Sequence, residues 1–191
     1  MELESQHYGD YQPDEGKYLL NGIEKHFHSP HEAIEEGISV IYQERQILME
    51  LSVAENIYLG RMPANKLGII KPHEANDMAQ KIINEFGLPI HPDTKVKDLS
   101  IAYQQMVEIM KAYSRENLKV ICFDEPTASL SDSEIDSLFS IINKLKKEGK
   151  IIIYVSHRME EVRRITDKVV IFKDGRYIGT VVTGSVPESE L

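Results

Sequence analysis

The chain has 191 residues, enough for one domain with a sizeable core, and carries 22 lysines and arginines against 31 aspartates and glutamates. Its formal charge of −9 repels phosphate backbones and anionic headgroups, which argues against nucleic acid as a partner. No apolar run approaches the roughly 20 residues of a membrane-spanning helix, and Met1 to Glu4 is acidic, unlike a secretory signal. With one cysteine, Cys122, no internal disulfide can form, which favours a reducing, cytosolic compartment.

The first predicted elements are a hairpin and a short strand. Lys17 to Leu20 and Ile23 to Phe27 flank Asn21-Gly22, a pair that tolerates the positive φ angles of a two-residue turn. Ile38 to Tyr42 then has the pattern of a short buried strand, and Gln43 follows at its carboxyl end.

Strand signals stop between Arg45 and about Asn117, where two helices are predicted. Pro72 opens the first, which Gly87 ends, and Ser100 is the expected N-cap of the second, which should continue to about Glu116. Helical spacing of apolar residues supports both, and the second helix should turn one face to the core through Met106, Ile109, Met110 and Tyr113.

The next stretch begins with a strand that ends in two acidic residues. Val120 to Phe123 is apolar and reads as a buried parallel strand, and it stops abruptly at Asp124-Glu125. Ser131 and Glu134 have capping-box spacing and should start a helix that Gly149 closes.

A second strand, helix and hairpin follow. Lys150 to Val155 is predicted to be another buried strand, ending at Ser156-His157, with a short helix from Arg158. Lys168 to Phe172 and Tyr177 to Val182 should then pair around a turn at Asp174-Gly175, and the tail after Thr183 is polar. The alternation of strands and helices predicts an α/β fold with a parallel sheet.

Three polar groups therefore follow predicted parallel strands: Gln43, Asp124-Glu125 and Ser156-His157. The carboxyl ends of parallel strands meet at one edge of a sheet, where ligands of α/β proteins bind. An oxygen ligand for Mg²⁺, a carboxylate facing water and a polar group near phosphoryl oxygens are what nucleotide hydrolysis needs. Ser100 adds a helix amino terminus, which suits a phosphate, although ordinary capping also accounts for it.

These residues resemble the nucleotide-binding subunits of ATP-binding cassette (ABC) transporters, specifically the tandem-cassette ATPases of sugar importers. The likeness runs from about Tyr11 to Val182. Val120 to Thr127 resembles the Walker B strand with its catalytic glutamate, and Ser129 to Asp132 resembles the D-loop. Gln43 matches the Q-loop, and Ser156 to Arg158 matches the switch histidine. Leu99 to Ile109 resembles the family signature.

The resemblance implies a role for each matching residue. Glu125 would polarise the attacking water and His157 would contact the γ-phosphate, with Asp124 and Gln43 around Mg²⁺. The signature and D-loop would face nucleotide held by a partner cassette, through Ser100, Ile101, Ala102, Gln104 and Asp132.

The family also implies a fold, cofactors and partners. The fold would be a P-loop NTPase (RecA-like) sheet core, with residues 1–44 and 118–183 around a helical subdomain at 45–117 and a tail at 184–191. ATP and Mg²⁺ are the expected cofactors. Permease subunits and a second cassette are the expected partners, with a sugar-binding protein acting indirectly. The chain would be held at the cytoplasmic face of the plasma membrane by the permease, without inserting into the membrane.

The main departure is that no G-x-x-x-x-G-K-[ST] phosphate loop occurs in the sequence. Neither Gly16-Lys17 nor Gly149-Lys150 has the required spacing and context. We therefore expect a chain that starts after this loop, lacks the Walker A strand-loop-helix, exposes sheet edges, and binds ATP weakly without turning it over. Ala102 also replaces the second signature glycine, where backbone should approach a phosphate.

Other interpretations of the sequence remain open. An inactive pseudo-subunit or regulatory module would explain the missing loop, and a gene fragment explains it more simply. A soluble ATPase of DNA repair or translation fits less well, because the charge is acidic and Leu51 to Arg61 resembles the transporter type. A metal site at His26, His28 and His31 lacks a fourth ligand.

Overall fold

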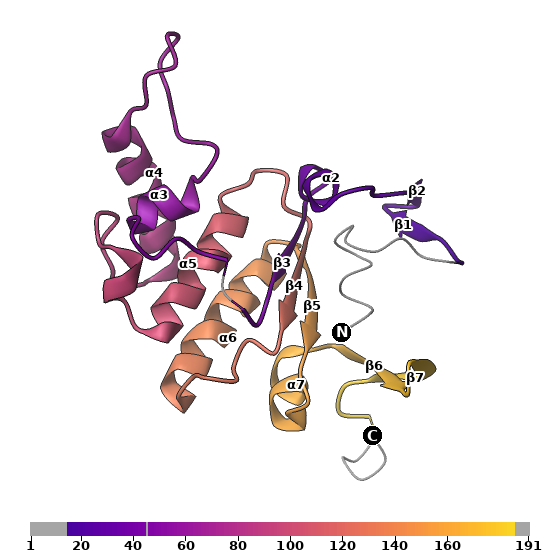
Figure 1. Ribbon diagram of the computed structural model, residues 1–191. Coiled ribbons are helices and arrows are strands. Elements are labelled where there is room, and N and C mark those ends of the chain that lie inside the picture. The colour runs from indigo at the N-terminus through magenta and orange to yellow at the C-terminus, as the bar shows by residue number, and fades with distance from the viewer. Residues whose placement is uncertain (1–14, 45, 186–191) are drawn as a thin grey trace. The chain divides into compact units, whose positions relative to one another are not determined.

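The computed structural model describes residues 15–44 and 46–185, and they fall into two compact units (Figure 1). The predicted acidic start, Arg45 and residues 186–191 of the polar tail lie outside this part. Of the described residues, the sheet unit comprises 15–40, Lys119–Glu125 and 142–185. The helical unit comprises 41–44, 46–118 and Pro126–Ile141.

The sheet unit begins with the predicted hairpin. Strands β1 (Tyr18–Leu20) and β2 (Ile23–Lys25) pair antiparallel, with Leu20 opposite Ile23. The two turn residues have positive φ angles, 54° at Asn21 and 78° at Gly22, as the asparagine-glycine pair predicts.

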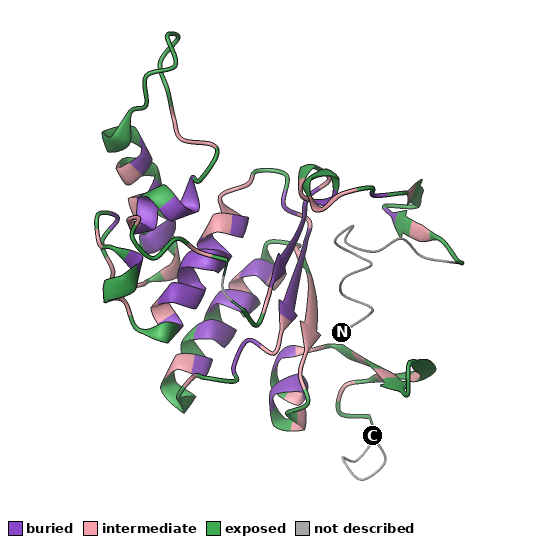
Figure 2. Ribbon diagram, in the orientation of Figure 1, coloured by how far each residue is buried: buried purple, intermediate pink, exposed green. Residues whose placement is uncertain are grey.

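A sheet of three strands in the order β3-β4-β5 follows. Its strands are β3 (Ile38–Ile41), β4 (Val120–Asp124) and β5 (Ile151–Val155). The parallel pairing of β4 and β5 confirms the predicted α/β parallel sheet, and β4 is buried along its apolar residues (Figure 2).

The prediction that β5 is buried is wrong. Ile151 is 55% exposed, and Ile152 to Val155 are only half-buried. Within the described residues β5 pairs with β4 alone, so its second edge has no neighbouring strand. An apolar run shows that a strand suits burial, but it does not show how many elements cover that strand.

Short helices and a second hairpin complete the sheet unit. Helix α2 (Pro30–Glu35) lies between the predicted hairpin and the predicted strand at Ile38, where no helix was predicted. The Ser29 hydroxyl caps it by accepting from the Glu32 N–H at 3.3 Å. Helix α7 is Met159–Ile165, and the predicted C-terminal hairpin is formed by β6 (Lys168–Lys173) and β7 (Arg176–Val182). Helix α6 (Asp132–Lys147) begins directly after Ser131, as predicted, and its residues up to Ile141 belong to the helical unit.

The helical unit contains α3 (Val53–Ile57), α4 (Pro72–Phe86), a 3₁₀ turn η1 (Val96–Asp98) and α5 (Ile101–Tyr113). Proline at the first position of α4 and Gly87 at its end, with a φ of 65°, confirm that prediction. A buried apolar cluster joins these helices, formed by Val53, Ala54, Ile57, Tyr58, Ala75, Ala79, Ile82, Ile83, Val96, Val107 and Met110.

Helix α5 starts after its predicted cap, Ser100, but ends about three residues before the predicted Glu116. Two side chains donate hydrogen bonds to backbone carbonyls at its end. The Ser114 hydroxyl donates to the Lys111 carbonyl at 2.8 Å, and the Arg61 guanidinium donates to the Ser114 carbonyl at 3.4 Å. The sequence pattern does not reveal these contacts, which satisfy the last turn.

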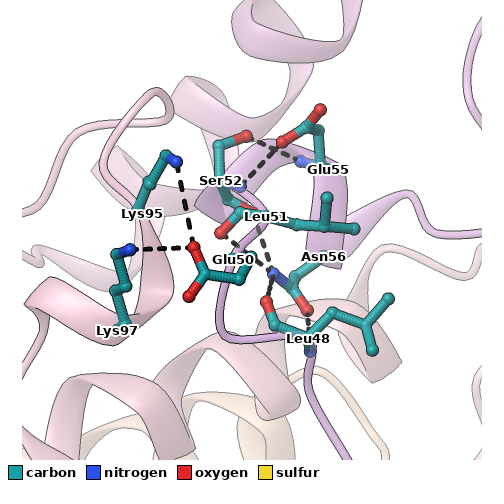
Figure 3. A network of polar contacts seen from close by, with 8 residues as sticks. All are labelled: Leu48, Glu50, Leu51, Ser52, Glu55, Asn56, Lys95 and Lys97. Atoms are coloured by element: carbon teal, nitrogen blue, oxygen red, sulfur yellow. Dashed lines mark hydrogen bonds and ion pairs between the residues drawn. The ribbon is translucent and has the colours of Figure 1, made fainter.

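A polar network orders the segment before α3 (Figure 3). The amide of Asn56 accepts from the Leu48 N–H at 2.8 Å and donates to the Leu48 and Ser52 carbonyls at 2.9 and 3.0 Å. Ser52 and Glu55 form a capping box at the start of α3. Glu50 pairs nearby with a lysine of η1, Lys97, at 2.8 Å.

None of the helices in residues 15–44 and 46–185 combines the length and the apolar character needed to span a bilayer.

Candidate functional site

Two strand ends meet in register within the sheet unit. Asp124, the last residue of β4, lies opposite Val155, the last residue of β5. The next residue along the chain, Glu125, donates its backbone N–H to the Val155 carbonyl at 3.0 Å. Parallel pairing therefore brings Asp124-Glu125 and Ser156-His157 to the same edge of the sheet.

Glu125 and His157 are in direct contact at this edge. Nδ1 of His157 lies 3.0 Å from Oε1 of Glu125. The imidazole is 74% exposed and the carboxylate 32% exposed, so water and small ligands can reach both. The pair combines a carboxylate that can accept a proton or orient water with a ring that can donate to an anion.

The backbone of Glu125 is in an unusual conformation. Its φ angle is 43°, in the left-handed region that non-glycine residues seldom occupy. Such conformations cost about 1 to 3 kcal/mol and persist where surrounding contacts enforce them, often in functional sites. The backbone bond to Val155 and the side-chain bond to His157 are two such contacts.

Asp124 is half-buried beside this pair. Across the described ranges no group of three histidine, cysteine, aspartate or glutamate side chains is arranged to hold a metal ion. A single carboxylate is nevertheless compatible with Mg²⁺, which binds few protein oxygens and keeps waters or substrate phosphates as its other ligands.

One residue near this edge had no signal in the sequence. Glu161 lies in the first turn of α7 and is only 4% exposed, yet its carboxylate receives bonds from Tyr154 and Ser156. A first-turn glutamate is common in helices, so nothing in the pattern distinguishes it from the exposed Glu160 beside it.

Gln43 belongs to the helical unit, where it is exposed two residues beyond the end of β3. Two side chains of α5 form hydrogen bonds with the segment that follows Gln43. The Glu108 carboxylate accepts from the Gln46 N–H, and Nζ of Lys111 donates to the Gln46 carbonyl at 3.2 Å. Burial lowers the pKa of Lys111, although the Glu108 carboxylate opposes this shift.

The residues at the start of α5 divide into exposed and internal ones. The Ser100 hydroxyl accepts from the Tyr103 N–H at 3.4 Å, and Ser100 and Ile101 are exposed. Ala102 is buried, and Gln104 donates to the carbonyls of Val96 at 3.2 Å and Leu99 at 3.0 Å. The exposed residues are therefore the ones that an approaching ligand would meet first.

Asp132 is the first residue of α6 and is exposed. It belongs to the helical unit, as do Gln43 and the residues at the start of α5. The structure thus brings together Glu125 and His157, with Asp124 adjacent in sequence. The participation of the helical-unit residues in the same site remains a prediction.

The alternative metal site does not form in the structure. His31 lies in α2, and its ring pairs with Glu35 at 3.7 Å, while His26 pairs with Glu24 at 3.5 Å. His26 and His28 follow β2 rather than sharing a face of it. No metal-binding group of three side chains includes them in the described part of the chain.

Comparisons with known proteins agree on one family. A family model described as "ABC transporter" matches residues 6–128. Among curated proteins, an arabinose import ATP-binding protein, AraG, of Escherichia coli is 49% identical over 90% of this chain and 34% of its own length. The protein of the same name from Mannheimia succiniciproducens is 47% identical over the same shares. This chain thus spans about a third of the length of these relatives.

A solved structure provides independent support for the fold. An ATP-binding cassette of an ABC transporter superposes with a TM-score of 0.80 at 26% identity, covering 95% of this chain and 75% of that one. Since it covers 95% of this chain, the likeness in fold extends beyond residue 128, where the family match ends.

Proposed function

Because the chain belongs to the ABC transporter family, we propose that it is part of an ATP-binding and ATP-hydrolysing subunit that powers carbohydrate import. The observation that carries this proposal is the 3.0 Å contact between Nδ1 of His157 and Oε1 of Glu125 at the carboxyl ends of parallel strands. The identity of 49% to a protein named for arabinose import supports a sugar as the cargo.

In this proposal Glu125 orients the attacking water. Its carboxylate is partly exposed, its backbone is held in a rare conformation, and its side chain is bonded to His157. A carboxylate in that place accepts a hydrogen bond from water and directs its oxygen towards phosphorus.

His157 contributes the second contact of the site. With Nδ1 facing Glu125, Nε2 is the nitrogen that remains to meet a phosphoryl oxygen. The pair therefore links the group that holds the water to the group that senses the γ-phosphate. An inactive pseudo-subunit would have no use for this linkage, which favours an enzyme.

The oxygen donors that the proposal assigns to the ion fit Mg²⁺ bound with ATP. The Asp124 carboxylate and the Gln43 amide carry hard oxygen donors of the type that Mg²⁺ accepts. When bound, the ion would neutralise phosphate charge, while Asp124 and Gln43 would hold its water shell in place. The 191 residues contain no G-x-x-x-x-G-K-[ST], so a phosphate loop for this site has to come from other residues.

The partners follow from the proposed role. Ser100, Ile101 and Asp132 are exposed in the helical unit and would meet nucleotide on a second cassette, with Ala102 and Gln104 behind them. Permease subunits would be the partners that ATP hydrolysis drives, and a sugar-binding protein would act through these permease subunits. The chain would then work at the cytoplasmic face of the membrane.

The test uses the longer subunit that contains these residues together with a phosphate loop. We expect Glu125→Gln to leave ATP binding intact and to lower Mg²⁺-dependent phosphate release by about two orders of magnitude, because a positioned base contributes this much. Glu160→Gln removes an exposed carboxylate of α7 and should keep the parent rate. Normal turnover by Glu125→Gln would overturn the proposal.

A further inference from the structure

Glu161 is a buried charge that needs compensation. The residue is 4% exposed, and a carboxylate removed from water is costly unless charged or polar groups surround it. Oε2 accepts from the Tyr154 hydroxyl at 2.8 Å and from the Ser156 hydroxyl at 3.4 Å, and Oε1 pairs with Nη1 of Arg158 at 2.6 Å.

The three residues that bind the Glu161 carboxylate lie on either side of His157 in the sequence. Tyr154 lies on β5, Ser156 directly precedes the histidine and Arg158 directly follows it. The Arg158 N–H also donates to the Ser156 hydroxyl at 3.0 Å, which closes the turn around the histidine. One carboxylate on α7 therefore fastens the strand end and both neighbours of His157.

Packing cannot fix the imidazole of His157, because 74% of its side chain is exposed. Its position depends on the backbone turn that carries it and on the contact with Glu125. We propose that Glu161 is a positioning residue that holds the turn from Ser156 to Arg158, so that Nδ1 of His157 stays within hydrogen-bonding distance of Glu125. Its relevance to catalysis rests on the proposed function, whereas the positioning itself does not.

The positioning is measured without nucleotide, by NMR of the histidine rings in the 191-residue chain. His157→Gln identifies the His157 signal among the seven histidines by its disappearance. Glu125→Gln should then shift that signal in the parent chain, because it alters the group bonded to Nδ1. In a Glu161→Gln background, where the charge that pairs with Arg158 is gone, this response should be lost.

Glu160→Gln is the matched control, since it makes the same change on the neighbouring residue, which is exposed. The response of His157 to Glu125→Gln should be as large in this background as in the parent. A general loss of charge on α7 would change the response of His157 equally in the Glu160→Gln and Glu161→Gln backgrounds. A response that is lost only with Glu161→Gln therefore assigns the effect to Glu161.

Glu161→Gln overturns the inference if it gives a dispersed spectrum in which His157 still responds fully to Glu125→Gln. Where that variant fails to fold, Tyr154→Phe decides, because it removes one donor and keeps the carboxylate. A reduced response in Tyr154→Phe supports the inference, and an unchanged one contradicts it. Because no ATP is involved, failure here is distinct from failure of the proposed function.

Discussion

Asn56 illustrates how a single polar residue can determine the conformation of a loop. It is fully buried, and its amide bonds four backbone groups of the segment that leads into α3, at Leu48, Leu51 and Ser52. Replacing it with alanine would leave the Leu48 N–H without this partner, whereas the Leu48 and Ser52 carbonyls keep the backbone N–H donors of Leu51 and residue 56. A donor left unpaired away from water is costly.

We therefore predict that Asn56→Ala lowers the free energy of unfolding by about 1 to 3 kcal/mol, the cost of leaving one polar group unpaired. Urea denaturation followed by circular dichroism measures the change. Asn143→Ala, at an exposed position of α6, is the control and should shift the midpoint little. Equal midpoints for Asn56→Ala and the parent would show that water replaces the amide.

At the same scale, sequence reasoning identified Glu125 and His157 as candidates because each follows an apolar strand. It did not show that they touch, since the register of β4 against β5 decides this. Asn56 and Glu161 gave no signal, because their importance comes from being buried, at 0% and 4% exposure. Burial of a polar residue is a tertiary property that local patterns do not encode.

At the scale of elements, Ser131 and Glu134 show how a helix start responds to pH. The Glu134 carboxylate accepts from the Ser131 N–H at 2.9 Å and from its hydroxyl at 2.7 Å. These bonds, first the one from the backbone and then the one from the side chain, lower the pKa of Glu134. A carboxyl with a lowered pKa in the folded state stabilises the protein above its usual pKa and loses this effect as pH falls through the lowered value.

We predict that Glu134→Gln destabilises the chain at pH 7 and that the difference from the parent shrinks as the solution is acidified below the usual carboxyl range. Thermal melts at a series of pH values measure it. Glu116→Gln, which removes an exposed carboxylate without a hydrogen bond in the described residues, should keep the parent's response. A difference that grows on acidification would contradict the assigned role.

Elements with strong local signals were predicted well. The two hairpins follow from Asn21-Gly22 and Asp174-Gly175, and α4 follows from its proline start and glycine end. Helix α2 was missed because its six residues are too few to show a clear apolar period. The exposure of β5 was missed because strand composition does not report its neighbours.

At the scale of the whole molecule, the α/β architecture and the family were both accessible from the sequence. Strand and helix alternation gives the parallel sheet, and spaced motifs give the family, which the match over residues 6–128 establishes. The division into two units separates Gln43, Ser100 and Asp132 from the glutamate-histidine pair, and their joint action remains the proposal.

In the proposed function Glu125 and His157 act as one unit in ATP hydrolysis, and a double-mutant cycle measures whether their contributions are coupled. Phosphate release by the longer subunit is measured for Glu125→Gln, His157→Gln and the double variant. Residues that act together lose their effect together, so the double variant should be about as slow as the slower single variant. Rate losses that multiply in the double variant would show that the two residues act independently, against the proposed function.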